Sequence, residues 1–186
     1  SKIMQGLLSL SRGIDAVTGF IGYHVRWLVL GAVLVSAANA FIRKIFDSSS
    51  NAWLEMQTLL FGIAFMCAAA YVLQKNAHVR IDVVSSRLKK RTRDWIDLFG
   101  HLFMLAPLCV IMVWLSGPTF LEAFIDDEGS SNAGGLPVWP YKHFVLVGFL
   151  LLFAQMMSEV IKRIAVLSGH LQEDDEHESS NAATTL

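Results

Sequence analysis

The sequence predicts an all-α membrane protein with four transmembrane helices and both termini in the cytoplasm. Three observations support this fold class. Of 186 residues, 54% are hydrophobic and only 17% are charged, whereas about a quarter of the residues in a soluble domain are charged. Four long apolar runs follow one another along the chain. The basic residues are segregated between these runs, which is typical of a chain oriented across a bilayer.

The four apolar runs are each long enough to cross a bilayer, which takes about 20 residues. They lie at about Val25–Ile45, Ala52–Leu73, Trp95–Ser116 and Tyr141–Val166. Each could be a core helix of a soluble protein, but four of them leave too little polar surface to cover them. Pro107 is expected to kink the third run. A Gly-, Ser- and Pro-rich outer loop is expected to follow Ser116.

The first run also resembles a secretory signal. Arg26 precedes the apolar residues, and Ala38-Asn39-Ala40 has the small-x-small pattern of a cleavage site. The polar region before it is unusually long for a signal peptide. We interpret the first run as a retained anchor.

The distribution of lysine and arginine orients the chain, because basic residues close to membrane ends stay cytoplasmic. One side carries Lys2, Arg12, Arg26, Lys75, Arg80, Arg87, Lys89, Lys90, Arg91, Arg93, Lys162 and Arg163. The other side carries only Arg43, Lys44 and Lys142. Both termini and the connection at residues 75–93 are therefore expected in the cytoplasm. The basic residues lie between apolar runs, so nucleic-acid binding is not expected.

Residues 1–24 form a first predicted domain, an amphipathic helix in the membrane interface. Apolar residues recur at alternating steps of four and three: Ile3, Leu7, Leu10, Ile14, Val17 and Ile21. Such a stripe favours an interfacial helix, and the alternative is a short helix packed on a partner protein. The membrane domain then covers 25–166, and 167–186 is an acidic tail whose composition predicts disorder.

The connection between the second and third runs is expected to hold a second interfacial helix. Its basic residues Lys89, Lys90, Arg91 and Arg93 would extend toward the phosphates of anionic phospholipids. The alternative is that the basic block serves only to set the topology. Trp139, before the fourth run, suits the opposite membrane–water boundary.

A face for helix contacts is predicted on the first and second runs. Ser36, Asn39 and Arg43 share a helical face with small residues, which let another helix approach closely. Arg43 could pair with Glu55 across the first hairpin, and Gly62 adds close-packing surface. This face could dock another membrane protein or pack within the chain's own bundle, and the residues leave both possibilities open.

The residue pattern gives no support for catalysis or cofactor binding. The spans carry no acidic residue at mid-depth, and the sequence has no metal-ligand spacing, activated nucleophile or phosphate-binding glycine loop. A membrane cytochrome needs two axial histidines at matched depth, and only His24 and His101 could form such a pair. A haem-binding four-helix anchor of a redox complex therefore stays as an alternative, beside a small self-sufficient transporter or channel.

Four short motifs, in order, resemble one family over roughly residues 20–165. They are Asn39-Ala-Phe-Ile-Arg43, Trp53-Leu-Glu55 followed by Gly62, His78-Val-Arg80-Ile-Asp82-Val, and Leu136-Pro137-Val-Trp139. Their order and spacing resemble the small membrane subunit (Q subunit, DctQ-type) of a tripartite ATP-independent periplasmic (TRAP) transporter. The long amphipathic start, the acidic outer loop and the acidic tail depart from a minimal version of this pattern.

The resemblance implies a function in the bacterial inner membrane. Such transporters have a periplasmic substrate-binding protein (P subunit) and a large membrane subunit (M subunit) with the sodium and substrate sites. They import small organic anions by an elevator motion. The small subunit would extend the fixed scaffold, without a cofactor, and help to receive the binding protein. His78, Arg80 and Asp82 would form a polar cluster at the cytoplasmic interface, or simply cap the next helix.

Overall fold

The computed structural model describes residues 2–48, 50–75 and 87–169, and this part of the chain is helical apart from its connections. The elements are α1 (Lys2–Phe46), α2 (Asn51–Gln74), α4 (Lys90–Gly100), η1 (His101–Leu105), α5 (Ala106–Ile125) and α6 (Trp139–Leu167). Within the described residues, four helices are long and apolar enough to cross a membrane, with α4, η1 and α5 joined end to end as one of them. The predicted fold class, an all-α chain with four spanning helices, is confirmed.

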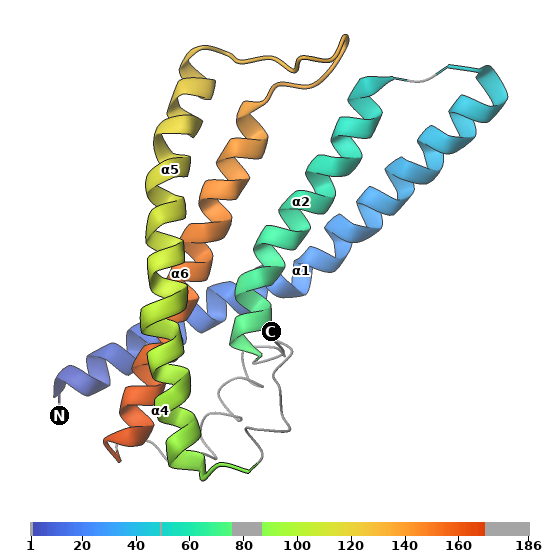
Figure 1. Cartoon of the computed structure of the whole chain (residues 1–186). Coiled ribbons are helices and arrows are strands. Elements are labelled where there is room, and N and C mark those ends of the chain that lie inside the picture. Colours follow the sequence, from blue (N-terminus) through green and yellow to red (C-terminus); the bar gives the residue numbers. More distant parts are fainter. Residues whose placement is uncertain (1, 49, 76–86, 170–186) are drawn as a thin grey trace.

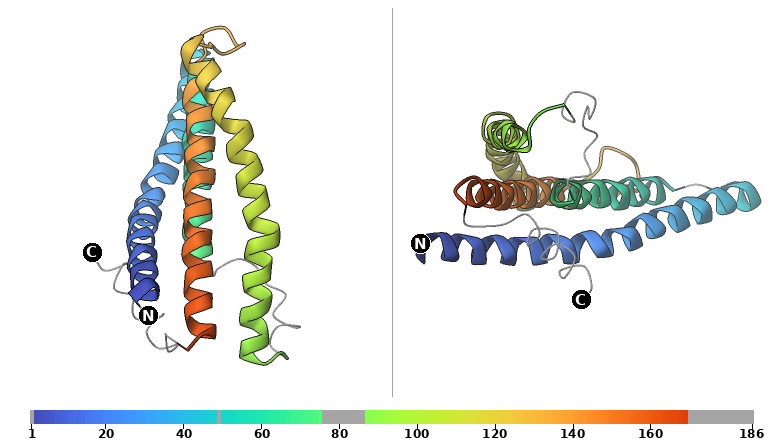
Figure 2. Two further views of the ribbon diagram at one scale, coloured as in Figure 1. Left: turned by 90° about the vertical axis from the view of Figure 1, so that its left-hand side faces the viewer. Right: turned by 90° about the horizontal axis from the view of Figure 1, so that it is seen from below.

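The four helices form three layers (Figure 2). α2 and α6 lie in the middle layer, α1 crosses one of its faces, and α4–α5 stands on the other face. In Figure 1, α1 passes behind α6 and then runs beside α2. α6 contacts every other helix of the described residues, whereas α5 packs mainly on α6. The arrangement is an open stack, so much of α1 and α5 is free to face lipid or a partner.

α1 is one continuous helix of 45 residues. At 1.5 Å per residue it is about 67 Å long, more than twice the thickness of a hydrocarbon core of about 30 Å. The predicted interfacial helix and the first span are thus two halves of a single helix, with no break at the expected boundary at residue 24. A contact that fixes the position of one half of α1 therefore also constrains the other half.

The third crossing is longer than the sequence indicated. It runs from Lys90 to Ile125, although an outer loop was expected after Ser116. Gly117 and Pro118 lie inside α5, and the helix continues because Phe120 and Phe124 pack against His143 and Trp139 of α6. Lys90, Arg91 and Arg93 belong to α4 at the other end.

The disturbance expected from Pro107 takes the form of a π-helical turn. Proline has no N–H to donate, and its ring conflicts with the carbonyl group four residues earlier. The turn immediately before it, η1 (His101–Leu105), is π-helical, which widens the helix at this point. The spanning helix is therefore not interrupted at Pro107.

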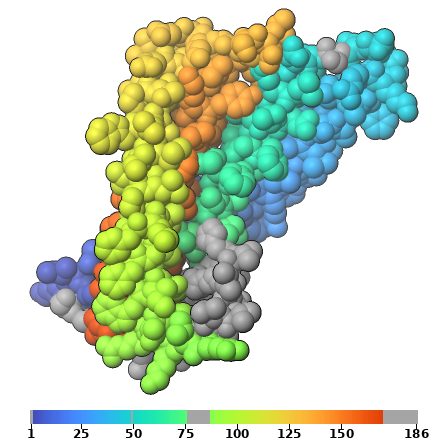
Figure 3. Space-filling view, viewed as in Figure 1, coloured from blue at the N-terminus to red at the C-terminus, as the bar shows by residue number. Residues whose placement is uncertain are grey.

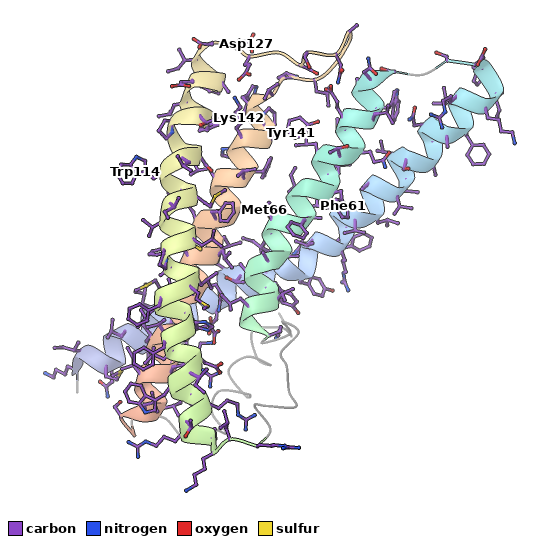
Figure 4. All side chains as sticks on the ribbon, viewed as in Figure 1. Phe61, Met66, Trp114, Asp127, Tyr141 and Lys142 are labelled. Atoms are coloured by element: carbon purple, nitrogen blue, oxygen red, sulfur yellow. The ribbon has the colours of Figure 1, made fainter. Side chains whose placement is uncertain are left out.

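Two glycines allow helices to approach closely. A Cβ atom on Gly22 of α1 would clash with the ring of Tyr71 on α2, and one on Gly148 of α6 would lie 2.7 Å from Cβ of Met66 on α2. Figure 4 shows Met66 on the side of α2 that faces α6. Both glycines therefore set the spacing of the layers.

Candidate functional site

A buried polar cluster joins the N-terminal half of α1 to the C-terminal half of α6. Ser158 Oγ donates a hydrogen bond to Asp15 Oδ1 over 2.7 Å, and Lys162 Nζ lies 2.8 Å from Asp15 Oδ2. We call this cluster the polar seam; its members are Ser11, Asp15, Gln155, Ser158, Glu159 and Lys162.

Gln155 and Lys162 each bridge two carboxylates in the polar seam. Gln155 Nε2 donates to Asp15 Oδ1 at 2.9 Å and to Glu159 Oε1 at 3.0 Å. Lys162 Nζ also lies 3.0 Å from Glu159 Oε1. The hydroxyl groups of Ser11 and Ser158 are 2.6 Å apart. Buried charges are stable only when paired and hydrogen-bonded, so the seam fixes how α1 lies on α6.

The seam turns part of the predicted amphipathic helix inward. Asp15 is only 8% exposed, whereas Ile3 is 78% exposed and Leu10 and Val17 are exposed as well. Ser11 and Asp15 do not belong to the apolar stripe, and their burial against α6 was not predicted from the sequence.

Two patterns in the sequence could have indicated the seam. Ser11, Asp15, Thr18, Gly22 and Val25 recur at steps of four and three along α1, the spacing of a packed helical seam. Gln155, Ser158, Glu159 and Lys162 lie three or four residues apart on one face of the fourth run. Polar residues on one face of an apolar helix favour a buried contact.

A second set of ion pairs ties α6 to α4. Arg163 Nη1 lies 2.6 Å from Asp94 Oδ1, and Arg163 Nη2 lies 3.6 Å from Asp97 Oδ2. Asp94 is buried. Lys162 and Arg163 are neighbours in the sequence, but successive residues point about 100° apart around a helix of 3.6 residues per turn. The two adjacent cations therefore bind α1 and α4, on opposite faces of the middle layer.

At the opposite end of the helix stack, Glu55 near the start of α2 organises the loop between α5 and α6. Its Oε1 accepts hydrogen bonds from Ser130 Oγ and from Asn132 Nδ2, and its Oε2 accepts one of 2.6 Å from the backbone N–H of Leu136. Tyr141 Oη donates to the Glu55 carbonyl oxygen over 2.6 Å. We call this set the outer clasp, because the distribution of basic residues predicts that this end faces outward. The outer clasp connects the start of α2 to the start of α6, at the end where the two ribbons diverge in Figure 1.

The loop itself is held by further contacts. Asn51 Nδ2 donates to the carbonyl group of Ala133, and Gly129 and Pro137 form an isolated antiparallel bridge. A Cβ atom on Gly135 would lie 2.5 Å from Cβ of Ser130, so a side chain there would displace this part of the loop. The predicted ion pair between Arg43 and Glu55 is wrong, because both Glu55 oxygens bind the loop and no such pair occurs among the described residues.

Comparison with known proteins gives the family. Residues 32–166 match the family described as "Tripartite ATP-independent periplasmic transporters, DctQ component". The chain belongs to the DctQ family. It is thus the small membrane component of a tripartite transporter and a multi-pass membrane protein, as the sequence motifs predicted. No curated protein and no solved structure matches the chain significantly.

The other residues predicted for partner contacts in this DctQ subunit lie in different environments. Asn39 is buried on the part of α1 that runs beside α2, Ser36 is half-buried and Arg43 is exposed. A Cβ atom on Gly62 would meet no atom within 4 Å. Gly62 is therefore not needed for packing inside the described part of the chain.

The residues predicted for membrane contacts lie at the two ends of the DctQ subunit. Lys89, Lys90 and Arg91 are exposed at the start of α4, and Arg93 is half-buried. Trp139 is the first residue of α6, and its ring packs edge-on against Phe124. His78, Arg80 and Asp82 lie outside the described residues, as do most of the predicted central interfacial helix and residues 170–186 of the acidic tail.

The histidines described in this DctQ subunit contact neighbouring residues. His24 Nδ1 lies 2.8 Å from the carbonyl oxygen of Phe20, and His143 packs against Phe120 and Phe144. Within the described residues, no group of three His, Cys, Asp or Glu side chains could hold a metal ion.

Proposed function

We propose that this DctQ subunit is a fixed, non-catalytic scaffold that anchors the large membrane subunit of a TRAP transporter in the bacterial inner membrane. In this proposal, both termini and residues 75–93 are cytoplasmic, and the outer clasp faces the periplasm. The large subunit carries the sodium and substrate sites and imports small organic anions. The small subunit holds it at a constant depth in the bilayer.

The observation that carries this proposal is that the charged groups inside the helix stack bind other helices of the same chain. Asp15, Glu159 and Lys162 join α1 to α6, and Asp94 and Arg163 join α4 to α6. Charges used for transport normally face a water-filled cavity or a bundle interior that opens to substrate. In this chain the buried charged groups instead bind helices to one another, as a scaffold beside a moving domain requires.

The outward surfaces support the same proposal. Trp114 is 77% exposed on α5 and points away from α6 in Figure 4. Figure 3 shows α4–α5 as a ridge along one edge of the molecule. Apolar residues on the outside of helices suit contact with lipid or with apolar helices of another subunit. No observation on the described residues favours the alternative of a haem anchor.

Co-expression of the small and large subunits tests the proposal. The large subunit should co-purify with this chain after gentle solubilisation, and liposomes containing both subunits, supplied with the binding protein, should take up substrate. Liposomes with this chain alone should not. Uptake by the chain alone would refute the scaffold role.

We also propose that Ser36, Arg43 and Gly62 contact the large subunit. Gly62→Leu should weaken co-purification while the purified small subunit keeps its thermal stability, because the site is open within the chain. Charge reversal at Arg43, which is exposed, should also weaken co-purification of the large subunit. Unchanged co-purification in both variants would remove these residues from the interface.

The loop held by the outer clasp is proposed to help receive the binding protein. Connections between neighbouring helices are usually short, and longer ones are commonly functional. This loop spans residues 126–138 and reaches across to α2. Loss of binding-protein stimulation of uptake in a Glu55→Gln variant that keeps the large subunit would support this role. Full stimulation would exclude it.

A further inference from the structure

The second half of α5 and the start of α6 enclose a groove of about 280 Å³. Its lining consists of Leu115, Ser116 and Thr119 from α5, and of Tyr141, Lys142 and Val145 from α6. Figure 4 labels Tyr141 and Lys142 near the start of α6, close to the loop that joins the two helices. Both helices, the loop and all six lining residues belong to the described range 87–169.

The walls of the groove are mainly apolar. Leu115 is 62% exposed on α5, and Val145 belongs to the wall that α6 supplies. Tyr141 contributes its ring, because its hydroxyl group already donates to the carbonyl oxygen of Glu55. The Thr119 hydroxyl group likewise donates to the carbonyl oxygen of Leu115, over 2.8 Å. An acyl chain therefore suits these walls better than a polar ligand does.

Lys142 is the charged residue of the lining, and it belongs to an accessible ion pair. Its Nζ lies 2.6 Å from Glu128 Oε2, and the two side chains are 27% and 48% exposed. The backbone of Glu128 is held on both sides, since its N–H donates to Ala123 and its carbonyl oxygen accepts from the N–H of Val138. One end of the apolar groove therefore carries a positive and a negative charge side by side.

A zwitterionic headgroup matches this pair of charges. The phosphate of phosphatidylethanolamine on Lys142, with its ammonium group on Glu128, gives each protein charge a second partner of opposite sign. An anionic headgroup would meet the Glu128 carboxylate with no cation of its own. A helix of another protein would remove both charges from water, which is costly. A headgroup stays at the membrane–water boundary, the level that Trp139 favours one turn before Lys142.

We propose that this groove binds one zwitterionic phospholipid. Its phosphate lies on Lys142, its ammonium group on Glu128, and the start of an acyl chain against Leu115 and Val145. The site goes beyond the proposed function, because it requires only that α5 and α6 span a bilayer and not that the large subunit binds. A lipid there would connect α5 to the start of α6 beside the loop of the outer clasp.

Native mass spectrometry of the full chain, released from nanodiscs of phosphatidylethanolamine and phosphatidylglycerol in equal parts, tests this site. The wild-type chain should retain phosphatidylethanolamine in preference to phosphatidylglycerol. Lys142→Gln should lower this retention about fivefold, the upper range for one partly exposed ion pair. Lys44→Gln removes the same charge from an exposed position on α1 outside the groove, and should leave retention unchanged.

The carboxylate arm predicts a change of preference and not merely a loss. Glu128→Gln removes the partner of the ammonium group and leaves the Lys142 charge open to an anion, so phosphatidylglycerol should replace phosphatidylethanolamine. Asp127→Asn removes a neighbouring exposed charge and should keep the wild-type preference. An unchanged preference in Glu128→Gln, or the same reversal in Asp127→Asn, would overturn the assignment of the ammonium group.

A third arm tests the apolar wall. Leu115→Ala should lower retention of phosphatidylethanolamine about fourfold, the effect of about one buried CH₂ group. Leu121→Ala truncates an exposed leucine of α5 outside the lining and should have no effect. Thermal melting checks that each variant folds, and a folding defect in one variant leaves the other two arms to decide. A wild-type preference for phosphatidylglycerol, or equal losses in the variants and their controls, would refute the site.

Discussion

The polar seam and the outer clasp both depend on a carboxylate that binds a distant part of the chain, but they differ in solvent exposure. Asp15 is buried between α1 and α6 and is paired with Lys162. Glu55 lies near the start of α2, and its partners are neutral hydroxyl, amide and backbone groups of a largely exposed loop. Removing a buried charged partner leaves the other charge uncompensated, whereas water can replace the partners of an exposed group. We therefore expect the seam to control global stability and the clasp to control local order.

The largest effect is expected from the seam. Asp15→Ala removes the carboxylate that Lys162, Gln155 and Ser158 share and leaves Lys162 and Gln155 with Glu159 alone. It should destabilise the chain by about 3 kcal/mol. Unfolding in mixed detergent micelles, followed by circular dichroism, measures this change. Arg12→Ala, at an exposed position on the same helix, should stay within about 0.5 kcal/mol of wild type. Equal stability of the two variants would mean that the seam does not hold α1.

A smaller effect on stability is expected from the uncharged contact between α2 and α6. Gly148→Leu forces a side chain against Met66 and should cost about 1–3 kcal/mol through overpacking. The same measurement on Gly62→Leu should show less than about 0.5 kcal/mol, because that site is open. If the two leucine variants proved equally stable, the close contact between α2 and α6 would be wrong.

The clasp should respond locally. Glu55→Gln keeps one acceptor oxygen and turns an NH₂ group toward existing donors, so the contacts with Ser130, Asn132 and Leu136 cannot all persist. Hydrogen exchange should accelerate in residues 128–138 and stay unchanged in α1. Asp127→Asn is the matched control in the same loop (Figure 4) and should leave exchange as in wild type. Acceleration throughout the chain would place the clasp in the global fold.

The smallest effect is expected from the surface ion pair at the base of the loop. Lys142 Nζ lies 2.6 Å from Glu128 Oε2, but both side chains are partly exposed. Lys142→Gln should change stability by less than about 1 kcal/mol, and added salt should reduce the difference further. A loss as large as that of Asp15→Ala would remove the contrast between buried and exposed contacts.

The spans were predictable because each is an apolar run of sufficient length. The family was predictable because short motifs at helix ends keep their order in the sequence. The extent of α5 was not predictable, because Gly117-Pro118 is typical of a helix end. The helix continues past it through aromatic packing on α6, a tertiary contact that local propensity does not contain.

The polar contacts were harder to predict than the spans. Arg43 and Glu55 flank the first hairpin, so proximity suggested a pair, but Glu55 instead binds a loop some 80 residues further along the chain. The seam joins positions 140 or more residues apart. Periodicity predicts which face of each helix is buried, but it does not predict which other helix that face contacts.

Disulfide cross-linking tests the central claim, that the N-terminal half of α1 is fixed on α6, most directly. The hydroxyl oxygens of Ser11 and Ser158 are 2.6 Å apart, so Ser11→Cys with Ser158→Cys should cross-link on mild oxidation in native membranes. Cys67 and Cys109 are replaced by alanine, and Arg12→Cys with Ser158→Cys is the control. We predict rapid cross-linking of the first pair alone, with uptake by the assembled transporter retained. Absence of this cross-link, or loss of uptake when it forms, would contradict the account.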